Sequence, residues 1–321
     1  MKRESVAVAY PTIPIVFVSS VHPDRIPLHN TMGLAVTDLK EETRTETRVE
    51  VVGDSNDITF YVDGKPIEKE KLRDVYRIVD IFKREAGVKN VGLKIDSRNY
   101  KIYSGASDAG AAALVVALDD LFETHMSRDR LAEISMMLSE SSVRALYGGL
   151  NELNVDGYPK IYGKLIADEN DLKNLKIFAL TFDYPTRVTA EEIFHATRSN
   201  PFYEYRLKMI PVWIAKIKEG LLHKDWDIVF SVAEENCANA HYLIESSGFG
   251  LRCRKKEMMA ACIDVEEIRA KGLSCYWTAG GGKVINVFSW GKDAPKVKKE
   301  LIKRGYKPVE YKVASGAKIV K

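Results

Sequence analysis

The chain has 321 residues, with 48 lysines and arginines against 45 aspartates and glutamates, and a formal net charge of +3. This length suffices for a large core, in one unit or in two lobes that share an interface. Positive and negative residues are interspersed, which argues against the broad basic surface of a nucleic-acid-binding protein. Two short basic clusters, at 254–256 and 298–304, are interpreted as solvated faces.

The four cysteines show no spacing typical of a redox motif or a zinc site. No two of them form a CxxC pair, and none has zinc-ligand spacing with a histidine; they are Cys237, Cys253, Cys262 and Cys275. Free thiols in a reducing compartment are the simplest interpretation. The amino terminus is unlike a signal peptide, and no apolar run reaches membrane-spanning length. These features predict a cytoplasmic protein with no membrane partner.

The first hundred residues are rich in β-branched and alternating apolar residues, a pattern typical of strands. Apolar residues also recur at helical spacing over Glu70–Glu85, and Gly87 ends that helix. Strands are expected at Val6–Ala9, Ile13–Ser20, Thr45–Val52, Ile58–Val62 and Val91–Ile95.

The rest of the chain is richer in helices. One helix is expected from the glycine-containing loop near residue 105 to Leu121, and others at Arg128–Leu138, Ala190–Arg198, Pro201–Gly220, Asp225–Glu245, Val265–Lys271 and Ala294–Arg304. Strands are expected at Leu175–Thr181, Ser274–Thr278, Val284–Ser289 and Tyr311–Val313. The pattern predicts an α+β protein with two lobes, residues 1–180 and 181–321, that meet at a cleft.

A run of small residues from Ser104 to Ala113 contains a single charge, Asp108. Small residues let backbone N–H groups approach a polyphosphate, and the start of a helix adds partial positive charge there. The run contains no Gly-Lys-Ser/Thr, so it is not a P-loop. Taken alone, it fits either a phosphate-binding loop or a tight connection to an Ala-rich, packed helix.

This run resembles the nucleotide loop of the GHMP kinase superfamily, most closely its mevalonate diphosphate decarboxylase branch, where alanines follow a pair of serines. Ser107 falls on the first serine and Asp108 replaces the second. An acid here would repel ATP phosphates unless it points away, caps the helix or contacts Mg²⁺, and the last two roles are equally open. The resemblance implies the two-lobed GHMP fold, Mg²⁺ near Ser107 and Asp108, and an ATP site formed by Ser104, Gly105, Ala106, Ser107, Asp108, Ala109 and Gly110.

A second motif, from Ser139 to Gly149, resembles the decarboxylase segment in which an arginine precedes a Gly-Gly turn. Arg144 falls on that arginine, which in the family holds the substrate carboxylate, a role suited to a forked donor. The alternative for Arg144 is a surface ion pair.

Glu140 lies in the same motif. In the decarboxylases, the corresponding region is rich in glycine and serine and receives the substrate's diphosphate. Two like charges about 5 Å apart repel by about 3 kcal/mol at an effective dielectric near 20. A carboxylate suits a free hydroxyl better, which indicates mevalonate itself, with its 5-hydroxyl facing Glu140. The alternative is an exposed glutamate at a helix end.

Two residues that support decarboxylation in the resembled branch are absent. The segment from Tyr10 to Val18 resembles the decarboxylase opening, and Val18 falls on the first lysine of a Lys-Tyr-Trp-Gly-Lys run. Thr278 replaces the aspartate of an Asp-Ala-Gly-Pro loop. Loss of a general base typically slows a reaction about 10²- to 10⁴-fold. Phosphoryl transfer depends mainly on positioning and charge stabilisation, so these losses favour a kinase.

The combination resembles the archaeal mevalonate 3-kinases, which phosphorylate the 3-hydroxyl of mevalonate and stop there. They too have Phe-Asp-Tyr followed by an arginine, which Phe182–Arg187 matches with one extra residue. Arg187 is then a candidate to stabilise the transferring phosphate, and a surface arginine is the alternative. The resemblance implies a catalytic role for Arg187, Thr278 and Ser104, and substrate binding by Val18, Glu140, Arg144 and Thr278.

The predicted function is phosphorylation of mevalonate at its 3-hydroxyl, dependent on ATP and Mg²⁺, by a cytoplasmic homodimer. Related acids such as 3-hydroxyisovalerate stay open as substrates, because recognition of the C5 end rests on one glutamate. Two alternatives also stay open. One is a decarboxylase of a phosphorylated mevalonate, which would need a basic pocket; the other is a non-catalytic relative that binds nucleotide or a protein partner.

Overall fold

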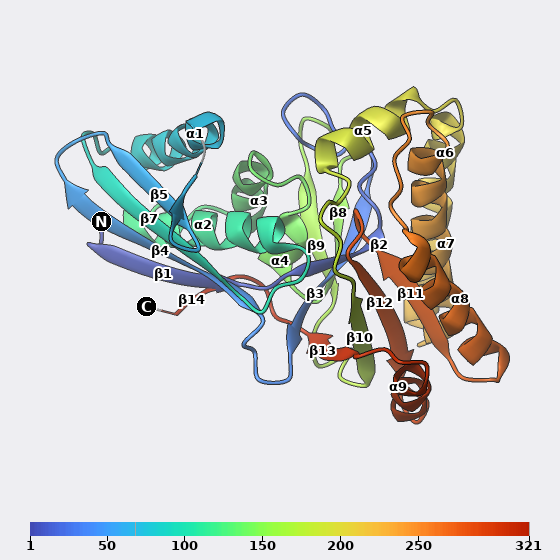
Figure 1. The fold of residues 1–321 in the computed structure, drawn as a ribbon. Helices are drawn as coiled ribbons and strands as arrows, with labels where there is room; N and C mark the ends of the chain where they lie inside the picture. Colours follow the sequence, from blue (N-terminus) through green and yellow to red (C-terminus); the bar gives the residue numbers. More distant parts are fainter. Residues whose placement is uncertain (68, 321) are drawn as a thin grey trace.

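Residues 1–67 and 69–320 are described by a computed structural model, in which two β-sheets lie in opposite halves of an elongated molecule (Figure 1). The first sheet has the strand order β14-β1-β4-β7-β5-β6. Its pairs are antiparallel except β5 with β7. The strands are β1 (Glu4–Ala9), β4 (Arg44–Gly53), β5 (Ile58–Val62), β6 (Lys65–Pro66), β7 (Gly92–Tyr100) and β14 (Lys318–Ile319).

Helices cover one face of this first sheet (Figure 1). Alternate residues such as Val49 and Ile95 point to that face and are fully buried, as the period of two in a strand requires. The central helix α2 (Ala106–Phe122) is rich in alanine, so it can approach β1 and β4 closely while α1 (Lys69–Glu85), α3 (Arg128–Met136) and α4 (Val143–Tyr147) pack around it. The glycine-containing loop therefore opens onto a rigid, buried helix.

The second sheet has the strand order β11-β12-β10-β13-β3-β8-β9, and β2 also pairs with β3. Pro14 in β2 is tolerated because β2 pairs on one side, where a missing N–H breaks no ladder. The strands are β2 (Thr12–Val16), β3 (Thr31–Asp38), β8 (Leu150–Asn154), β9 (Tyr162–Ala167), β10 (Leu175–Thr181), β11 (Cys275–Ala279), β12 (Val284–Trp290) and β13 (Val309–Val313).

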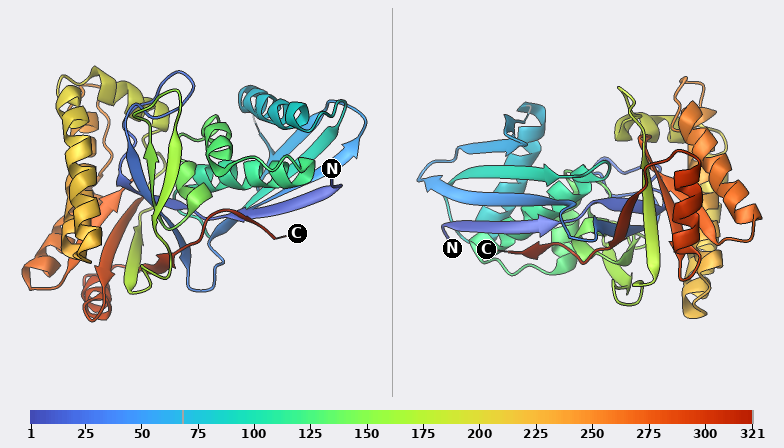
Figure 2. Two further views of the ribbon diagram at one scale, coloured as in Figure 1. Left: turned by 180° about the vertical axis from the view of Figure 1, so that it is seen from behind. Right: turned by 60° about the horizontal axis from the view of Figure 1, so that its bottom comes forward.

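Both faces of this second sheet are covered. In β10, Ile177 and Ala179 belong to the core beneath α6 (Tyr203–Leu222) and α7 (Trp226–Glu245), and α5 (Ala190–Ser199) also packs against these two helices. Phe178 and Leu180, which alternate with them, belong to the core beneath α8 (Lys256–Ala270) and α9 (Ala294–Lys303). The two views of Figure 2 show these helices on either side of the sheet.

The predicted α+β class is confirmed, but one expected strand ends earlier than predicted and another strand was missed. The strand expected over 13–20 ends at Val16, because the residues after it form a loop held by side chains of α6 and α7. The strand at 31–38 was not expected: its residues are buried on both faces, so no polar alternation reveals it.

The predicted lobe boundary at residue 180 remains a proposal. That residue falls inside β10, whose sheet takes strands from both sides of it, and β14 returns to pair with β1. The chain termini therefore lie near each other at one end of the molecule (Figure 1). Within the described ranges, no helix combines the length and apolar character that crossing a bilayer requires.

Candidate active site

The glycine-containing loop begins where β7 leads into α2. Gly105 has φ 77° and a backbone so close to β2 that an added Cβ would lie 2.6 Å from the Thr12 nitrogen. Only glycine fits this left-handed, close approach. The loop leaves the hydroxyls of Ser104 and Ser107 on exposed residues, while the following alanines are buried in the core.

Asp108, in the first turn of α2, is buried and takes neither a backbone cap nor a surface position. Its Oδ1 accepts hydrogen bonds from Ser139 Oγ (2.6 Å) and Ser141 Oγ (2.8 Å), and its Oδ2 accepts one from Thr12 Oγ1. The capping role considered for Asp108 is therefore not seen: its recorded partners are three side-chain hydroxyls. Through them, Asp108 ties the two sequence motifs together.

Arg144 projects from α4 and is buried, with 6% of its surface exposed. Its Nη2 donates to the Val16 carbonyl (3.3 Å), and its Nε is buried without a partner among the described residues. Burial lowers the pKa of Arg144, while the nearby charges of Asp108 and Glu140 oppose that shift. The side chain crosses β3 at Gly33, where an added Cβ would lie 2.2 Å from Arg144 Cδ.

Glu140 precedes α4, and its side chain is largely buried. Its Oε2 accepts a hydrogen bond from Arg25 Nη2 at 2.8 Å. Arg25 lies in the loop between β2 and β3, and its Nη1 also reaches Glu191 of α5 at 3.5 Å. No local sequence signal pointed to Arg25, because its partners lie more than a hundred residues away.

Asp108, Glu140 and Arg144 form what we call the charged wall of the site. We call a second group of lining residues, Phe17, Val18, Gly280 and Gly281, the uncharged wall; Thr278, two residues before Gly280, is buried and does not line the cavity.

The Phe17–Ser19 part of the uncharged wall is fixed by Arg206, a fully buried arginine on α6. Its Nη2 donates to the Phe17 carbonyl (3.0 Å) and its Nε to Ser19 Oγ (3.1 Å). Asn236 Oδ1 accepts from the Phe17 N–H (2.9 Å). Ser19 Oγ lies 2.7 Å from His29 Nε2, and His29 Nδ1 lies 2.8 Å from the Asn30 carbonyl, so the ring donates through Nδ1. Neutral acceptors thus surround the buried guanidinium.

The glycine loop after Thr278 is fixed by α7. Cys237 Sγ accepts from the Ala279 N–H (3.2 Å), and His241 Nε2 donates to the Gly280 carbonyl (3.0 Å). Burial raises the pKa of Cys237 to about 12 and lowers that of His241 to about 3, so both side chains are neutral. Thr278 itself is fully buried, and its Oγ1 has no partner in the described part of the chain.

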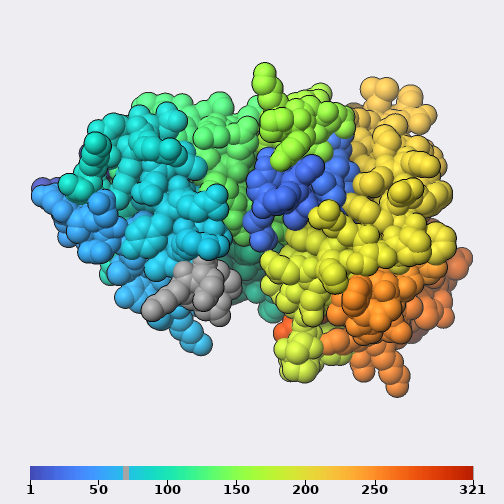
Figure 3. Space-filling model, turned by 90° about the horizontal axis from the view of Figure 1, so that it is seen from above, coloured from blue at the N-terminus to red at the C-terminus, as the bar shows by residue number. Residues whose placement is uncertain are grey.

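The two walls enclose a central cavity of about 140 Å³. A side cavity of about 390 Å³ adjoins it; Ser107 lines both, and the side cavity also contains Phe60, Ile67, Gly110 and Leu138. In Figure 3 a hollow separates the cyan atoms around α1 from the yellow atoms of α5, and the blue loop after β2 lies at its edge.

Most of the predicted site residues meet here. The central cavity is lined by Val18, Ser104, Gly105, Ser107, Asp108, Glu140, Arg144 and Arg187, and the side cavity by Ala106, Ser107 and Gly110. Ala109 instead points into the core, and Thr278 lies behind the cavity rather than on its surface. Their predicted roles remain proposals.

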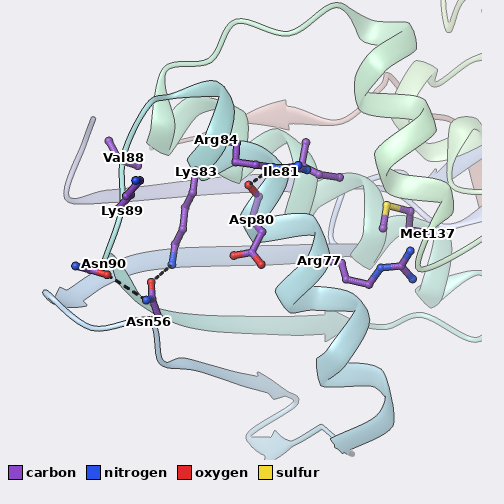
Figure 4. Close-up of a pocket in the computed structure, with 10 residues that line it drawn as sticks. All are labelled: Asn56, Arg77, Asp80, Ile81, Lys83, Arg84, Val88, Lys89, Asn90 and Met137. Atoms are coloured by element: carbon purple, nitrogen blue, oxygen red, sulfur yellow. Dashed lines mark hydrogen bonds between the residues drawn. The ribbon is translucent and has the colours of Figure 1, made fainter.

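A third pocket, of about 580 Å³, lies on the far side of α1 (Figure 4). Arg77, Arg84 and Lys89 line it, and Lys83 reaches Asn56 at 3.2 Å. It shares only Met137 with the side cavity and includes none of the predicted site residues. We therefore place the candidate active site at the central and side cavities.

The described residues contain no cluster of three or more histidine, cysteine, aspartate or glutamate side chains that could hold a metal ion alone. Mg²⁺ usually keeps several waters and takes one or two protein ligands together with substrate phosphates. Asp108 Oδ2 accepts one recorded hydrogen bond and so retains a lone pair, and Ser107 is exposed beside it. These residues fit a magnesium ion that arrives with a nucleotide.

Known proteins resemble this chain over nearly its whole length. A family profile described as diphosphomevalonate decarboxylase-like N-terminal domain matches residues 21–158. Mevalonate-3-kinase of Picrophilus torridus is 29% identical over 300 residues, which cover 91% of this chain and 90% of that protein. Mevalonate 3-kinase of Thermoplasma acidophilum is 30% identical over 286 residues, which cover 86% and 85%.

The fold agrees with these relatives. The crystal structure of mevalonate-3-kinase from Thermoplasma acidophilum, bound to mevalonate 3-phosphate and ADP, matches with a TM-score of 0.88 and 25% identity, covering 100% of this chain and 99% of that one. The fold is that of a GHMP-type small-molecule kinase. Within that class, the chain belongs to the family of mevalonate 3-kinases and diphosphomevalonate decarboxylases.

Proposed function

We propose that this protein uses ATP to phosphorylate mevalonate at its 3-hydroxyl, giving mevalonate 3-phosphate and ADP without decarboxylation. The two similar enzymes above carry the name mevalonate 3-kinase. The observation that carries the proposal is the presence of Glu140 in the same cavity as Arg144. The charged lining of this cavity consists of two carboxylates, Asp108 and Glu140, and two guanidinium groups, Arg144 and Arg187. Such a balanced lining suits a hydroxy acid with a free hydroxyl better than a diphosphate.

The charged wall would recognise the two ends of mevalonate. Arg144 has a buried Nε without a described partner, and a substrate carboxylate would supply the acceptor. Arg25 occupies Oε2 of Glu140, which leaves Oε1 for the 5-hydroxyl. A phosphate in that place would face the carboxylate and be repelled.

The uncharged wall would hold the reacting carbon without assisting loss of CO₂. Val18 lines the cavity where a lysine would be needed, and Thr278 supplies a hydroxyl rather than a carboxylate. Phosphoryl transfer can proceed from positioning and charge stabilisation. Arg187 and Ser104, which line the cavity, would contact the transferring group, whose negative charge they offset.

The nucleotide would place its base in the side cavity and its phosphates along Ser107, where the loop backbone and the start of α2 favour negative charge. Mg²⁺ would be held by Asp108 and Ser107 and would neutralise phosphate charge. We also propose a cytoplasmic location, which four buried, unpaired cysteines suit, and a homodimer of two-lobed subunits.

One incubation tests the function. The protein is mixed with ATP, Mg²⁺ and R-mevalonate, and ADP, phosphorus-31 NMR and released CO₂ are followed together, with 3-hydroxyisovalerate and mevalonate diphosphate as parallel substrates. We expect ADP and a stable tertiary phosphate ester with no CO₂. Release of CO₂ with free phosphate would show a decarboxylase, and ATP binding without turnover would show a non-catalytic relative.

A further inference from the structure

Arg25 lies at the boundary between the two cavities. It lines the side cavity, as does Glu191, whereas Glu140 lines the central one. Its guanidinium contacts a carboxylate on each side: Nη2 lies 2.8 Å from Glu140 and Nη1 lies 3.5 Å from Glu191. Ser107, which lines both cavities, marks where they adjoin, so a phosphate group of a nucleotide in the side cavity could come within reach of Arg25.

The two ion pairs of Arg25 differ in strength. Glu140 is largely buried, with 12% of its side chain exposed, whereas the side chain of Glu191 is 71% exposed. A long ion pair with an exposed partner contributes little, because water and salt screen it. The contact with Glu191 is therefore the one that an incoming anion can replace.

Arg25 also has an unused donor and a constrained backbone. Its Nε is buried without a partner in the described part of the chain, and its φ of 69° is uncommon for a residue with a side chain. A buried donor without a partner is costly unless a ligand supplies an acceptor. Burial lowers the pKa of Arg25, but the two carboxylates outweigh that effect, so the group stays charged.

We propose that Arg25 binds the terminal phosphate of the nucleotide, exchanging Glu191 for a phosphate oxygen while it keeps Glu140. This assignment rests on the proposed function only in taking the nucleotide to occupy the side cavity. Arg25 then contacts both Glu140, which would bind the substrate hydroxyl, and the terminal phosphate that is transferred. Glu191 acts as a stand-in for phosphate when the nucleotide is absent.

The proposal predicts opposite effects of two substitutions on the affinity for a non-hydrolysable ATP analogue, measured by calorimetry with Mg²⁺ and without mevalonate. Arg25→Gln should weaken the analogue at least about tenfold, since a charge-assisted hydrogen bond is lost. Adenosine should be affected less than twofold. Glu191→Gln should tighten the analogue about threefold at low salt, since a competing carboxylate is removed.

Two further variants separate phosphate binding from a structural role. Arg130→Gln removes a surface arginine paired with Glu133 at 2.7 Å and should change neither affinity. Arg25→Lys keeps the charge and should retain part of the affinity for the analogue if Arg25→Gln folds poorly. Three results would overturn the assignment. Arg25→Gln could lower the affinity for the analogue and for adenosine equally, Arg25→Gln could leave the affinity for the analogue unchanged, or Glu191→Gln could bind the analogue more weakly than the wild-type protein.

These measurements also separate the proposal from the substrate assignment. If the predicted affinity changes are found but mevalonate is not phosphorylated, the role of Arg25 is supported and the substrate assignment is wrong. If mevalonate is phosphorylated but Arg25→Gln binds the analogue normally, the substrate assignment is supported and the proposed role of Arg25 is wrong. If the wild-type protein binds no nucleotide, both are wrong.

Discussion

The two walls of the central cavity are built on different principles. The charged wall places Asp108, Glu140 and Arg144 together and pairs them with hydroxyls, with Arg25 and with a backbone carbonyl. The uncharged wall presents Phe17, Val18 and glycine backbone; behind it lie two neutral histidines and one buried cation, Arg206, whose guanidinium donates to the Phe17 carbonyl. In the proposed function, the charged wall recognises the ends of the substrate and the uncharged wall faces C3.

This contrast indicates how one scaffold can change its reaction. A buried charge is costly unless it is paired or needed by a ligand. In this chain, the loops at Phe17–Ser19 and Ala279–Gly280 are held by hydrogen bonds from Arg206, Asn236, Cys237 and His241. In the proposed function, the wall keeps its shape through these bonds and does not need the lysine and aspartate of the resembled decarboxylases.

The largest expected effect comes from removing the cation of the charged wall. Arg144→Met should lower kcat/KM for mevalonate by about 10³-fold, because the substrate carboxylate would lose a buried, charge-assisted partner. Arg144→Lys should recover only part of this loss, since a single ammonium cannot reproduce the forked donor. Steady-state kinetics on folded variants would measure both, and a loss below tenfold would contradict the carboxylate assignment.

A smaller effect is expected from neutralising the anion of the same wall. Glu140→Gln should raise KM for mevalonate about 10- to 100-fold, since a carboxylate accepts a hydroxyl hydrogen bond more strongly than an amide does. The affinity for 3-hydroxyisovalerate, which has no 5-hydroxyl, should change much less. An unchanged kcat/KM for mevalonate would remove Glu140 from substrate recognition.

A substitution of Thr278, behind the uncharged wall, should raise the stability of the protein and lower its activity. Thr278→Val replaces a buried hydroxyl that has no described partner, so the free energy of unfolding without ligand should rise by about 1 kcal/mol. If the hydroxyl meets the substrate or transferring phosphate, kcat/KM should fall by about tenfold. Denaturant unfolding and kinetics measure the two effects. A gain in stability with full activity would leave Thr278 without a catalytic role.

The last prediction concerns how the free energy of unfolding depends on pH, because both histidines behind the uncharged wall are neutral. Burial lowers the pKa of His29 and of His241 to about 3, against an ordinary 6.5. Between these values the unfolded chain binds more protons, so the free energy of unfolding should fall as pH drops below 6.5. Each histidine should contribute roughly 1 kcal/mol per pH unit.

Urea unfolding between pH 4.5 and 7.5 would measure this slope. His29→Gln and His241→Gln should each remove part of it, although both variants lose hydrogen bonds. A slope in either variant as steep as that of the wild-type protein would contradict the assignment of these histidines as neutral.

Much of the site could be predicted because its residues lie within short motifs. The small-residue run fitted either a phosphate-binding loop or a tight connection to a packed helix; the approach of Gly105 to Thr12 and the buried alanines show the tight connection, and phosphate binding stays a prediction. Helical spacing predicted 70–85, and α1 covers Lys69–Glu85. The role of Asp108 could not be predicted, because its three hydroxyl partners are distant in the sequence. Thr12 belongs to β2, and Ser139 and Ser141 lie in a loop more than thirty residues after Asp108.

The supporting residues could not be predicted for the same reason. Arg206 and Asn236 hold Phe17 from 189 and 219 residues away in the sequence. Nothing in a helix sequence shows that an arginine will be buried without an acid. Arg25 depends on a backbone conformation that its sequence does not favour. The motifs define the surface of the cavity, whereas tertiary packing decides which distant side chains hold it in place.

The bare backbone of Gly33 has a consequence for how this pocket can evolve. The Arg144 side chain runs where a Cβ at position 33 would be, so any larger residue there would displace the guanidinium without touching substrate. A larger residue at position 33 is therefore compatible only with a shorter or displaced side chain at position 144. If Arg144 binds the substrate carboxylate as proposed, a residue of β3 that does not touch the substrate limits which acids the pocket can accept.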